Sequence, residues 1–245
     1  MKPSIVVFFS LLFLNTTAQD KNHFFALDAH MNQTVLDSSK YILWVHQKTD
    51  SNWEWDYYNT WGPLIKATSY ADVDGKIRNG RFCLYNHYGF LDSMGEYDHD
   101  RKNGSFYKLR SSGTDKIEIL MQYDYSNDSL VKITRVDTEN IAKKMKDTTT
   151  TKESEFGLGN SAWTDYLKEK TKYPDRASLK NIHGQVQLRY QVDENGEVKD
   201  IYIQKSVEYS LDQESIQILG NGGKWIPGLK NGMPVKTYKW QPFNY

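Results

Sequence analysis

A short run of strict alternation is the feature of this chain that most restricts its fold. Apolar residues occupy every second position from Val186 to Val192, with Gln or Arg between them. This period of two is typical of a strand with one buried face. A turn signal containing Asn-Gly follows at 193–196, and a second apolar run extends from Val198 to Ile203. The pattern predicts an antiparallel hairpin, and its change of phase near Asp200 predicts a bulge.

Helical patterns flank this hairpin on both sides. Residues 161–170 place apolar side chains on one face of a short helix, which Tyr173-Pro174 would end, and 176–180 predict a second helical turn. Residues 211–219 predict a further helix, with Ser210 as its N-terminal cap and a glycine-rich segment after it. A last strand is predicted from Val235 to Trp240.

This order of helix, hairpin, helix and strand carries motifs that resemble the TonB C-terminal domain family over residues 161–245. Each motif is short and unspecific alone, but together they keep the family's order and spacing. They are Tyr173-Pro174, Ala177, Ile182-x-Gly184-x-Val186, Val192-Asp193, Asn195-Gly196-x-Val198, Ser206, Leu211-Asp212-x-Glu214, Trp225-x-Pro227-Gly228, Asn231-Gly232-x-Pro234-Val235 and Pro242.

The resemblance implies an α+β unit in which three antiparallel strands pack on two helices and the last strand has a free edge. Envelope partners, such as a peptide of an outer-membrane transporter, add a strand to that edge through main-chain hydrogen bonds. Tyr173 and Pro174 would lie near the start of the edge, Lys236 and Lys239 would keep it soluble, and Trp225 is better explained by core packing. The docking edge itself would consist of Val235, Lys236, Thr237, Tyr238, Lys239 and Trp240.

The region before this unit, residues 19–136, is aromatic-rich and strand-like. Asn79-Gly80-Arg81-Phe82 recurs as Asn103-Gly104-Ser105-Phe106, with Gly95-Glu96-Tyr97 between them. Because Asn-Gly favours two-residue hairpin turns, the repeat predicts stacked hairpins. Gly-x-aromatic followed by Asn-Gly-x-aromatic resembles the MORN-type repeat, which implies an antiparallel β platform for partners; an unrelated antiparallel sheet is the alternative. Two further strands are expected around Ser126-Asn127-Asp128.

The N-terminus has the pattern of an export signal. Lys2 precedes a short apolar run from Ile5 to Leu14, and small residues lead up to Ala18. Residues 1–18 are therefore predicted to be a cleaved signal peptide, which implies a periplasmic or cell-envelope protein. The apolar run is shorter than the roughly 20 residues that span a bilayer. An uncleaved anchor, which would associate the protein with the membrane, is the alternative.

Residues 137–160 are polar, with a Lys-rich patch and a Thr run, and predict a flexible linker between the two units. Such a linker is short compared with the periplasm-spanning arm that energy transduction requires in the TonB family. The resemblance therefore implies docking rather than force transduction, with a membrane-anchored transducer and a structural envelope scaffold as alternatives. A free edge can also pair with itself, so a homodimer stays open.

Composition argues against several other functions. The 31 Lys and Arg residues balance 31 Asp and Glu residues, so there is no excess of positive charge for nucleic acid. No G-x-S-x-G, Walker or H-E-x-x-H motif occurs, so we expect neither catalytic residues nor a cofactor, and no enzyme. His87 and His99 would form a metal site only with further ligands, so a solvated Asp-His-Asp turn at 98–100 is favoured. Cys83, the one cysteine, is predicted to be a buried apolar residue rather than a catalytic thiol.

Overall fold

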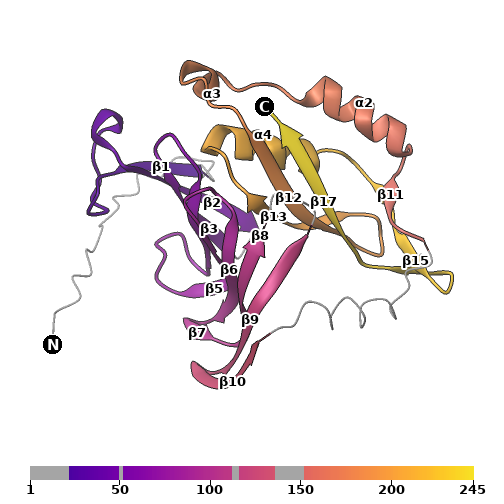
Figure 1. The fold of residues 1–245 in the computed structure, drawn as a ribbon, viewed down its shortest axis with the longest axis horizontal. Helices are drawn as coiled ribbons and strands as arrows, with labels where there is room; N and C mark the ends of the chain where they lie inside the picture. The colour runs from indigo at the N-terminus through magenta and orange to yellow at the C-terminus, as the bar shows by residue number, and fades with distance from the viewer. Residues whose placement is uncertain (1–21, 50–51, 112–115, 136–151) are drawn as a thin grey trace, which may run out of the picture.

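The computed structural model describes residues 22–49, 52–111, 116–135 and 152–245. The first three ranges form a large antiparallel sheet and the last forms a smaller α+β unit beside it (Figure 1). The predicted signal peptide at 1–18 and residues 137–151 of the predicted linker lie outside these ranges. Among the helices of the described ranges, none has the length and apolar character needed to cross a membrane.

The N-terminal sheet is a meander in which successive strands pair with one another. Its strand order is β1-β2-β3-β4-β5-β6-β8-β9-β10, with the short β7 beside β6. A 3-10 helix, η1 (Leu36–Ser38), follows the first strand. The strands are β1 (Asn22–Leu27), β2 (Tyr41–Thr49), β3 (Asn52–Asn59), β4 (Leu64–Tyr70), β5 (Arg78–Tyr85), β6 (Leu91–Asp98), β7 (Arg101–Lys102), β8 (Gly104–Ser111), β9 (Ile117–Ser126) and β10 (Ser129–Arg135).

A row of aromatic side chains connects successive strands of this sheet. Phe82, Tyr97, Phe106 and Tyr125 meet edge to face, with neighbouring ring centroids 5.7, 5.5 and 5.3 Å apart. Gly95 makes room for this row, because a Cβ atom there would lie 2.3 Å from the Phe106 ring. Cross-strand aromatic pairs of this kind stabilise a sheet. The antiparallel strand repeat predicted from the sequence is therefore present.

The turns of the repeat, however, differ from the predicted ones. Gly80 lies within β5 and pairs with Tyr97, and Gly104 begins β8, so neither Asn-Gly pair forms a hairpin turn. The chain reverses at His99-Asp100, with φ values of 47° and 69°, and at Asn127-Asp128, with φ values of 47° and 66°. Two successive residues at positive φ match the twist of a hairpin, and Asn and Asp tolerate that conformation. The predicted turn at Asn127-Asp128 and the Asp-His-Asp turn are thus confirmed.

The C-terminal unit packs three antiparallel strands, in the order β13-β12-β17, against helices. This confirms the predicted α+β class. The elements are β11 (Glu155–Phe156), α2 (Asn160–Lys170), α3 (Asp175–Leu179), β12 (Gln185–Val192), β13 (Val198–Lys205), α4 (Tyr209–Gly220), β14 (Trp225–Ile226), β15 (Gly228–Lys230), β16 (Met233–Val235) and β17 (Thr237–Asn244).

The apolar positions of the alternating segment are buried as the period predicts, and Gln187 on the opposite face is buried as well. Val186, Leu188, Tyr190 and Val192 are all buried, and β12 pairs with β13 in an antiparallel hairpin. The expected bulge is also present, because Asp200 takes a positive φ of 56° and the register shifts opposite it. Side chains on the buried face of β12 form the centre of the core with α4.

The cap of α4 differs from the prediction. Glu208, rather than Ser210, is the N-cap residue, and its carboxylate accepts the Ser210 N–H at 2.8 Å. The Glu208 side chain is fully buried, and the Arg176 Nε donates to its other oxygen at 2.6 Å. A buried carboxylate needs such partners, so the Glu208 side chain both begins α4 and holds α3 against it.

The described end of the predicted linker is also part of the C-terminal unit. Residues 152–160 contain β11, which pairs with β14, and the first residue of α2. Phe156 is buried against Trp163 and Trp225, with ring centroids 5.0 and 5.8 Å away. The sequence does not predict this aromatic contact, because a polar segment with glycines is typical of a linker. Trp225 packs in the core, as expected.

The two units share one hydrophobic core. Buried residues of the large sheet, such as Leu64 and Cys83, belong to the same cluster as the core of the C-terminal unit. Backbone contacts join them as well: the Ser206 N–H donates to Gly89 O at 2.9 Å, and the Leu64 N–H donates to the Ser206 hydroxyl at 2.8 Å. The Tyr209 ring meets the rings of Trp44 and Tyr58 edge to face. The N-terminal sheet therefore lies directly on β13 and α4.

Candidate functional site

The outer strand of the C-terminal sheet, β17, has one unpaired edge. It pairs with β12 on one side over eight consecutive residues, from Thr237 opposite Val192 to Asn244 opposite Gln185. Within the described part of the chain, no strand pairs with its other side. An unpaired edge presents a row of free main-chain donors and acceptors, which is a template for another strand.

The register of the pair shows which backbone groups face that edge. Gly184 and Tyr245 exchange two hydrogen bonds of 3.1 and 3.0 Å, and the register is unbroken from there to Thr237. Because hydrogen-bonded pairs alternate in an antiparallel ladder, the odd-numbered residues of β17 bond to β12. The even-numbered residues turn their backbone groups outward; these are Tyr238, Trp240, Pro242 and Asn244.

Pro242 divides this edge in two. Proline has no N–H and is tolerated in a sheet where that position faces away from the ladder. The outward donors of the first part belong to Tyr238 and Trp240, and the next residue in the outward row can only accept. The first part of β17, residues 237–241, therefore offers an alternating set of donors and acceptors.

Side chains on the inner face hold β17 in place. The Thr237 hydroxyl donates to the Ser154 hydroxyl at 2.6 Å, and Phe243 is buried in the core. The Lys239 Nζ donates to Ser154 O at 2.7 Å, so Lys239 anchors the strand and does not protect the free edge as predicted. Tyr238 points the other way, with 68% of its surface exposed. The edge is thus a fixed strand with an accessible aromatic side chain.

Helix α2 flanks the second part of the strand (Figure 1). Leu167 and Lys168 of α2, the C-cap residue Thr171 and residues 242–244 of β17 line a small groove of about 230 Å³. The Trp163 Nε1 also donates to the Gln241 side chain at 2.9 Å. A strand approaching the edge therefore meets α2 beyond residue 241, and the open stretch is 237–241.

The structure changes the predicted edge at its first residue. Val235 belongs to β16 and pairs with Gly228 of β15, and β17 begins only at Thr237, after Lys236. A tight hairpin of β15 and β16 uses up the backbone groups that a partner would need. The strand continues instead to Asn244, which the prediction did not include. Phe243, an apolar residue beyond Pro242, is the sequence signal for this extension, but Pro242 is typical of a strand end.

Tyr173 and Pro174 also lie elsewhere than expected. The Tyr173 hydroxyl donates to Ile182 O at 2.8 Å, and its ring stacks on His183 with a centroid distance of 5.3 Å. These residues precede Gly184, which pairs with Tyr245. Tyr173 therefore lies near the far end of β17, and the predicted closeness to the start of the edge is wrong.

The residues considered for catalysis occupy unsuitable settings. Cys83 is buried, and this burial raises the pKa of its thiol to about 12, so it is not a thiolate at neutral pH. His99 bonds to the neighbouring Asp98 on an exposed turn at 2.6 Å. In the described ranges, no group of three or more His, Cys, Asp or Glu side chains is placed to hold a metal ion. That the chain is not an enzyme stays a prediction.

Comparison with known proteins agrees with the geometry of the C-terminal unit. Residues 169–245 match the family model of the Gram-negative bacterial TonB protein C-terminal. The search of curated proteins and the search of solved structures each found no match. The family match does not reach residues 22–135, so the resemblance to MORN-type repeats rests on the strand repeat alone. The match confirms the predicted resemblance of the C-terminal unit to the TonB C-terminal family over residues 169–245.

Proposed function

We propose that this chain is an exported protein of the cell envelope that docks an extended peptide of a partner as a fourth strand on β17. The observation that carries the proposal is the unpaired edge of β17 in a domain of the TonB C-terminal family. Main-chain hydrogen bonds from the edge supply affinity, and side-chain contacts supply preference among peptides. A peptide from an outer-membrane transporter is the partner that the family resemblance favours.

The stretch 237–241 sets the size of the docked segment. Tyr238 and Trp240 offer their N–H and C=O groups outward, and Pro242 offers only its carbonyl. A partner strand of about five residues would therefore pair fully, and a longer one would meet α2. The exposed Tyr238 ring would lie along the side chains of the docked peptide, where an aromatic residue contributes apolar contact at low entropic cost.

A matched set of variants tests this docking mode. Tyr238→Pro removes one outward donor without touching the ladder to β12, and Pro242 shows that this strand accepts proline at an outward position. Tyr238→Ala keeps the donor and removes only the ring. We expect Tyr238→Pro to weaken peptide binding at least tenfold, which corresponds to about 1.4 kcal/mol, with an unchanged circular dichroism spectrum.

The measurement is fluorescence anisotropy of labelled transporter N-terminal peptides, titrated with the chain from Gln19 onward. Wild-type affinity in Tyr238→Pro would contradict strand addition at β17. Failure of every transporter peptide to bind would contradict the choice of partner. Pairing between two copies through the same edge would appear in sedimentation as a dimer, and Tyr238→Pro would dissociate that dimer.

Two alternatives remain testable by other means. A membrane-anchored transducer requires an intact N-terminal segment, so fractionation and N-terminal sequencing separate it from an exported docking protein. A mature N-terminus at Gln19 in the soluble fraction would exclude the transducer. A structural scaffold is favoured by the shared core of the two units, and it predicts that no peptide binds β17 although the chain is fully folded.

A further inference from the structure

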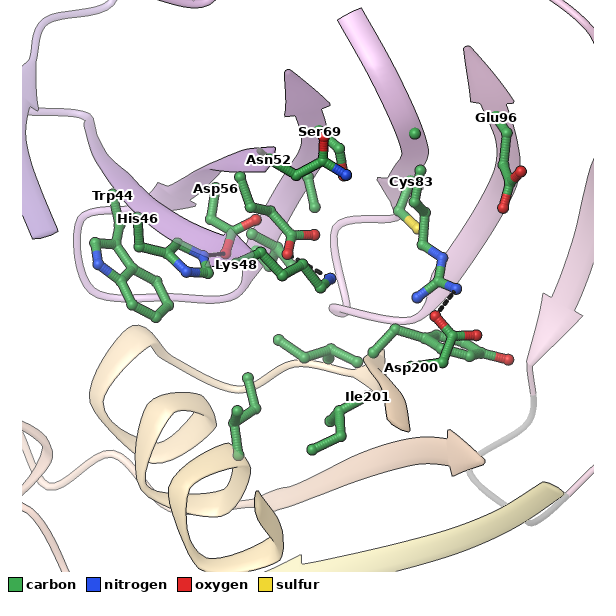
Figure 2. A pocket seen from close by; sticks show the side chains of 18 of the residues that line it. Trp44, His46, Lys48, Asn52, Asp56, Ser69, Cys83, Glu96, Asp200 and Ile201 are labelled. Carbon is green, nitrogen blue, oxygen red and sulfur yellow. Dashed lines mark hydrogen bonds and ion pairs between the residues drawn. The ribbon is translucent and has the colours of Figure 1, made fainter. Parts of the chain in front are cut away.

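A cavity of about 650 Å³ lies where the two units meet. One wall is the inner face of strands β2 to β6, and the other consists of β13 and Ile216 of α4 (Figure 2). The volume lies within the range of small-molecule sites, which is roughly 300–1,000 Å³. Because both units contribute walls, the cavity exists only when they are packed together.

The wall from the large sheet carries charges that are already paired. The His46 Nε2 lies 3.0 Å from Asp56 Oδ2, and the Lys48 Nζ lies 2.5 Å from Glu54 Oε2. The guanidinium of Arg81 bonds through Nη2 to the carboxylate of Asp200 on the opposite wall (Figure 2). The lysine of the opposite wall, Lys199, is held by Glu197 at 2.7 Å. Of the charged side chains that line the cavity in the described residues, all except that of Glu96, an exposed residue, are therefore paired.

Individual polar atoms in this wall nevertheless lack hydrogen bonds. Arg81 Nε and Nη1 and Asp56 Oδ1 are buried without a partner. The side chains concerned are 13% and 8% exposed, respectively. A buried polar group left unsatisfied destabilises a folded protein, so such a group calls for a ligand or water as its partner. The Arg81 and Asp56 side chains that carry these atoms line a cavity large enough to hold a molecule.

The ligand must satisfy donors and a carboxyl oxygen without adding net charge. A free anion or cation would add net charge to a wall whose buried charged side chains are already paired, which is costly in a buried site. A hydroxyl group accepts from a guanidinium and donates to a carboxylate, so it suits both kinds of atom. Apolar lining from Leu64, Ala67 and Ile201 adjoins these polar atoms, and it would contact the C–H surfaces of a ring.

We propose that this cavity binds a small uncharged polyhydroxy compound of the saccharide class, with Arg81 donating to its oxygens and Asp56 bonding to a hydroxyl. This site is separate from the β17 edge and does not depend on peptide docking. Since its walls come from both units, a bound saccharide stabilises their contact, and ligand binding raises the unfolding temperature of the whole chain.

Calorimetric titration of the chain from Gln19 onward tests the proposal with glucose, maltose and N-acetylglucosamine as probes. Glucuronate, glucosamine and glycine betaine serve as anionic, cationic and zwitterionic counterparts. We expect at least one neutral saccharide to bind more tightly than all three counterparts. Absence of saccharide binding, as expected for a cavity filled only by water, overturns the proposal, and so does tighter binding of a charged or zwitterionic probe.

Variants assign the binding to this cavity. Arg81→Lys keeps a cation beside Asp200 but removes the Nε and Nη1 donors, so we expect at least tenfold weaker saccharide binding. Arg110→Lys is the matched control, because Arg110 pairs with Glu118 on the exposed part of the sheet. Equal affinity of wild type and Arg81→Lys overturns the assignment. An unchanged unfolding temperature of the unliganded Arg81→Lys variant shows that the loss comes from the ligand contact and not from misfolding.

Discussion

Within the described residues, the large sheet and the three-stranded sheet each end in an unpaired edge strand, β10 and β17, and these two strands are built differently. Leu130, Val131 and Ile133 of β10 are between 48% and 67% exposed, so neither face of this strand is covered. In β17, Thr237 and Phe243 are buried and Ser154 holds the inner face. An edge becomes a docking surface when the strand behind it is fixed, because binding then costs little ordering entropy.

The free edge of β10 also carries features that oppose pairing. Its register against β9 shifts between Leu130 and Lys132, which indicates a bulge, and Lys132 and Arg135 add charge. Bulges and charged side chains are common ways of protecting an exposed edge. Of the two edges, β17 is therefore the one on which we propose that a partner docks.

The largest expected effect concerns how firmly each strand is held. Phe243→Ala removes a ring that is 3% exposed and leaves a cavity behind β17. We expect a loss of about 3–5 kcal/mol in the free energy of unfolding, measured by urea denaturation. Ile133→Ala in β10, where the side chain is 53% exposed, should cost less than about 1 kcal/mol. Equal losses in the two variants would remove the contrast between the strands.

The second effect concerns the buried carboxyl group of Asp212 in α4. Burial raises the pKa of Asp212 from 3.8 to about 8, against hydrogen bonds from Ser206 and Val207 that lower it. The folded protein then holds a proton that the unfolded chain has lost, so this contribution to stability is fully present below about pH 3.8 and disappears as the pH rises through about 8.

We therefore expect the free energy of unfolding to fall by roughly 1.4 kcal/mol per pH unit between pH 5 and pH 8 through this group. In Asp212→Asn the group no longer titrates, and its contribution to the slope vanishes. Urea denaturation of both proteins at pH 5, 6.5 and 8 gives the comparison. The same slope in wild type and Asp212→Asn would show that Asp212 is ionised in the folded state.

A smaller effect separates the exposed side chains of the two edges. Tyr238→Ala should weaken peptide binding about threefold to fivefold, since it removes aromatic contact worth about 0.5–1 kcal/mol. Val131→Ala, at a comparably exposed position of β10, should leave the affinity unchanged. Anisotropy titrations with one peptide measure both. Weaker binding in Val131→Ala would indicate that the peptide docks on the large sheet.

The smallest effect lies within β17 itself. The amide protons of Lys239 and Gln241 bond to β12, whereas those of Tyr238 and Trp240 face outward. Hydrogen exchange followed by NMR should therefore alternate, with slow exchange at the odd positions and fast exchange at the even ones. A bound peptide should slow the even positions selectively. Uniform exchange along the strand would contradict the register.

Local sequence patterns account for much of the C-terminal unit. The alternation from Val186 to Val192 and the phase change at Asp200 predicted a hairpin with a bulge, because each depends on side chains only a few residues apart. Local patterns do not predict the outcome where another residue can take the same pairing or capping role. Val235 is a residue type that favours strands, but it pairs with Gly228 in the β15–β16 hairpin and so does not belong to β17. Ser210 is a residue type that favours the N-cap, but the buried Glu208 takes that position and is held by the partly buried Arg176.

Contacts between the two units are even harder to predict from the sequence than the elements of the C-terminal unit. The Arg81 side chain was visible only as part of a repeat, and its partner Asp200 was visible only as a change of phase. Leu64 and Ser206 are likewise joined across most of the chain. Such pairs depend on how the two folded units pack against each other. The cavity between the units could therefore not be predicted from periodicity or motifs.

The meeting of Gly89 with Ser206 has a consequence for how this protein could change over time. A Cβ atom at position 89 would lie 2.2 Å from Ser206 O, so any other residue there forces the units apart. A change in the backbone of either the N-terminal sheet or the C-terminal unit at this contact therefore requires a matching change in the other. A chimera that carries a different domain of the same family on this sheet would assemble only if its backbone reproduced the path around Ser206.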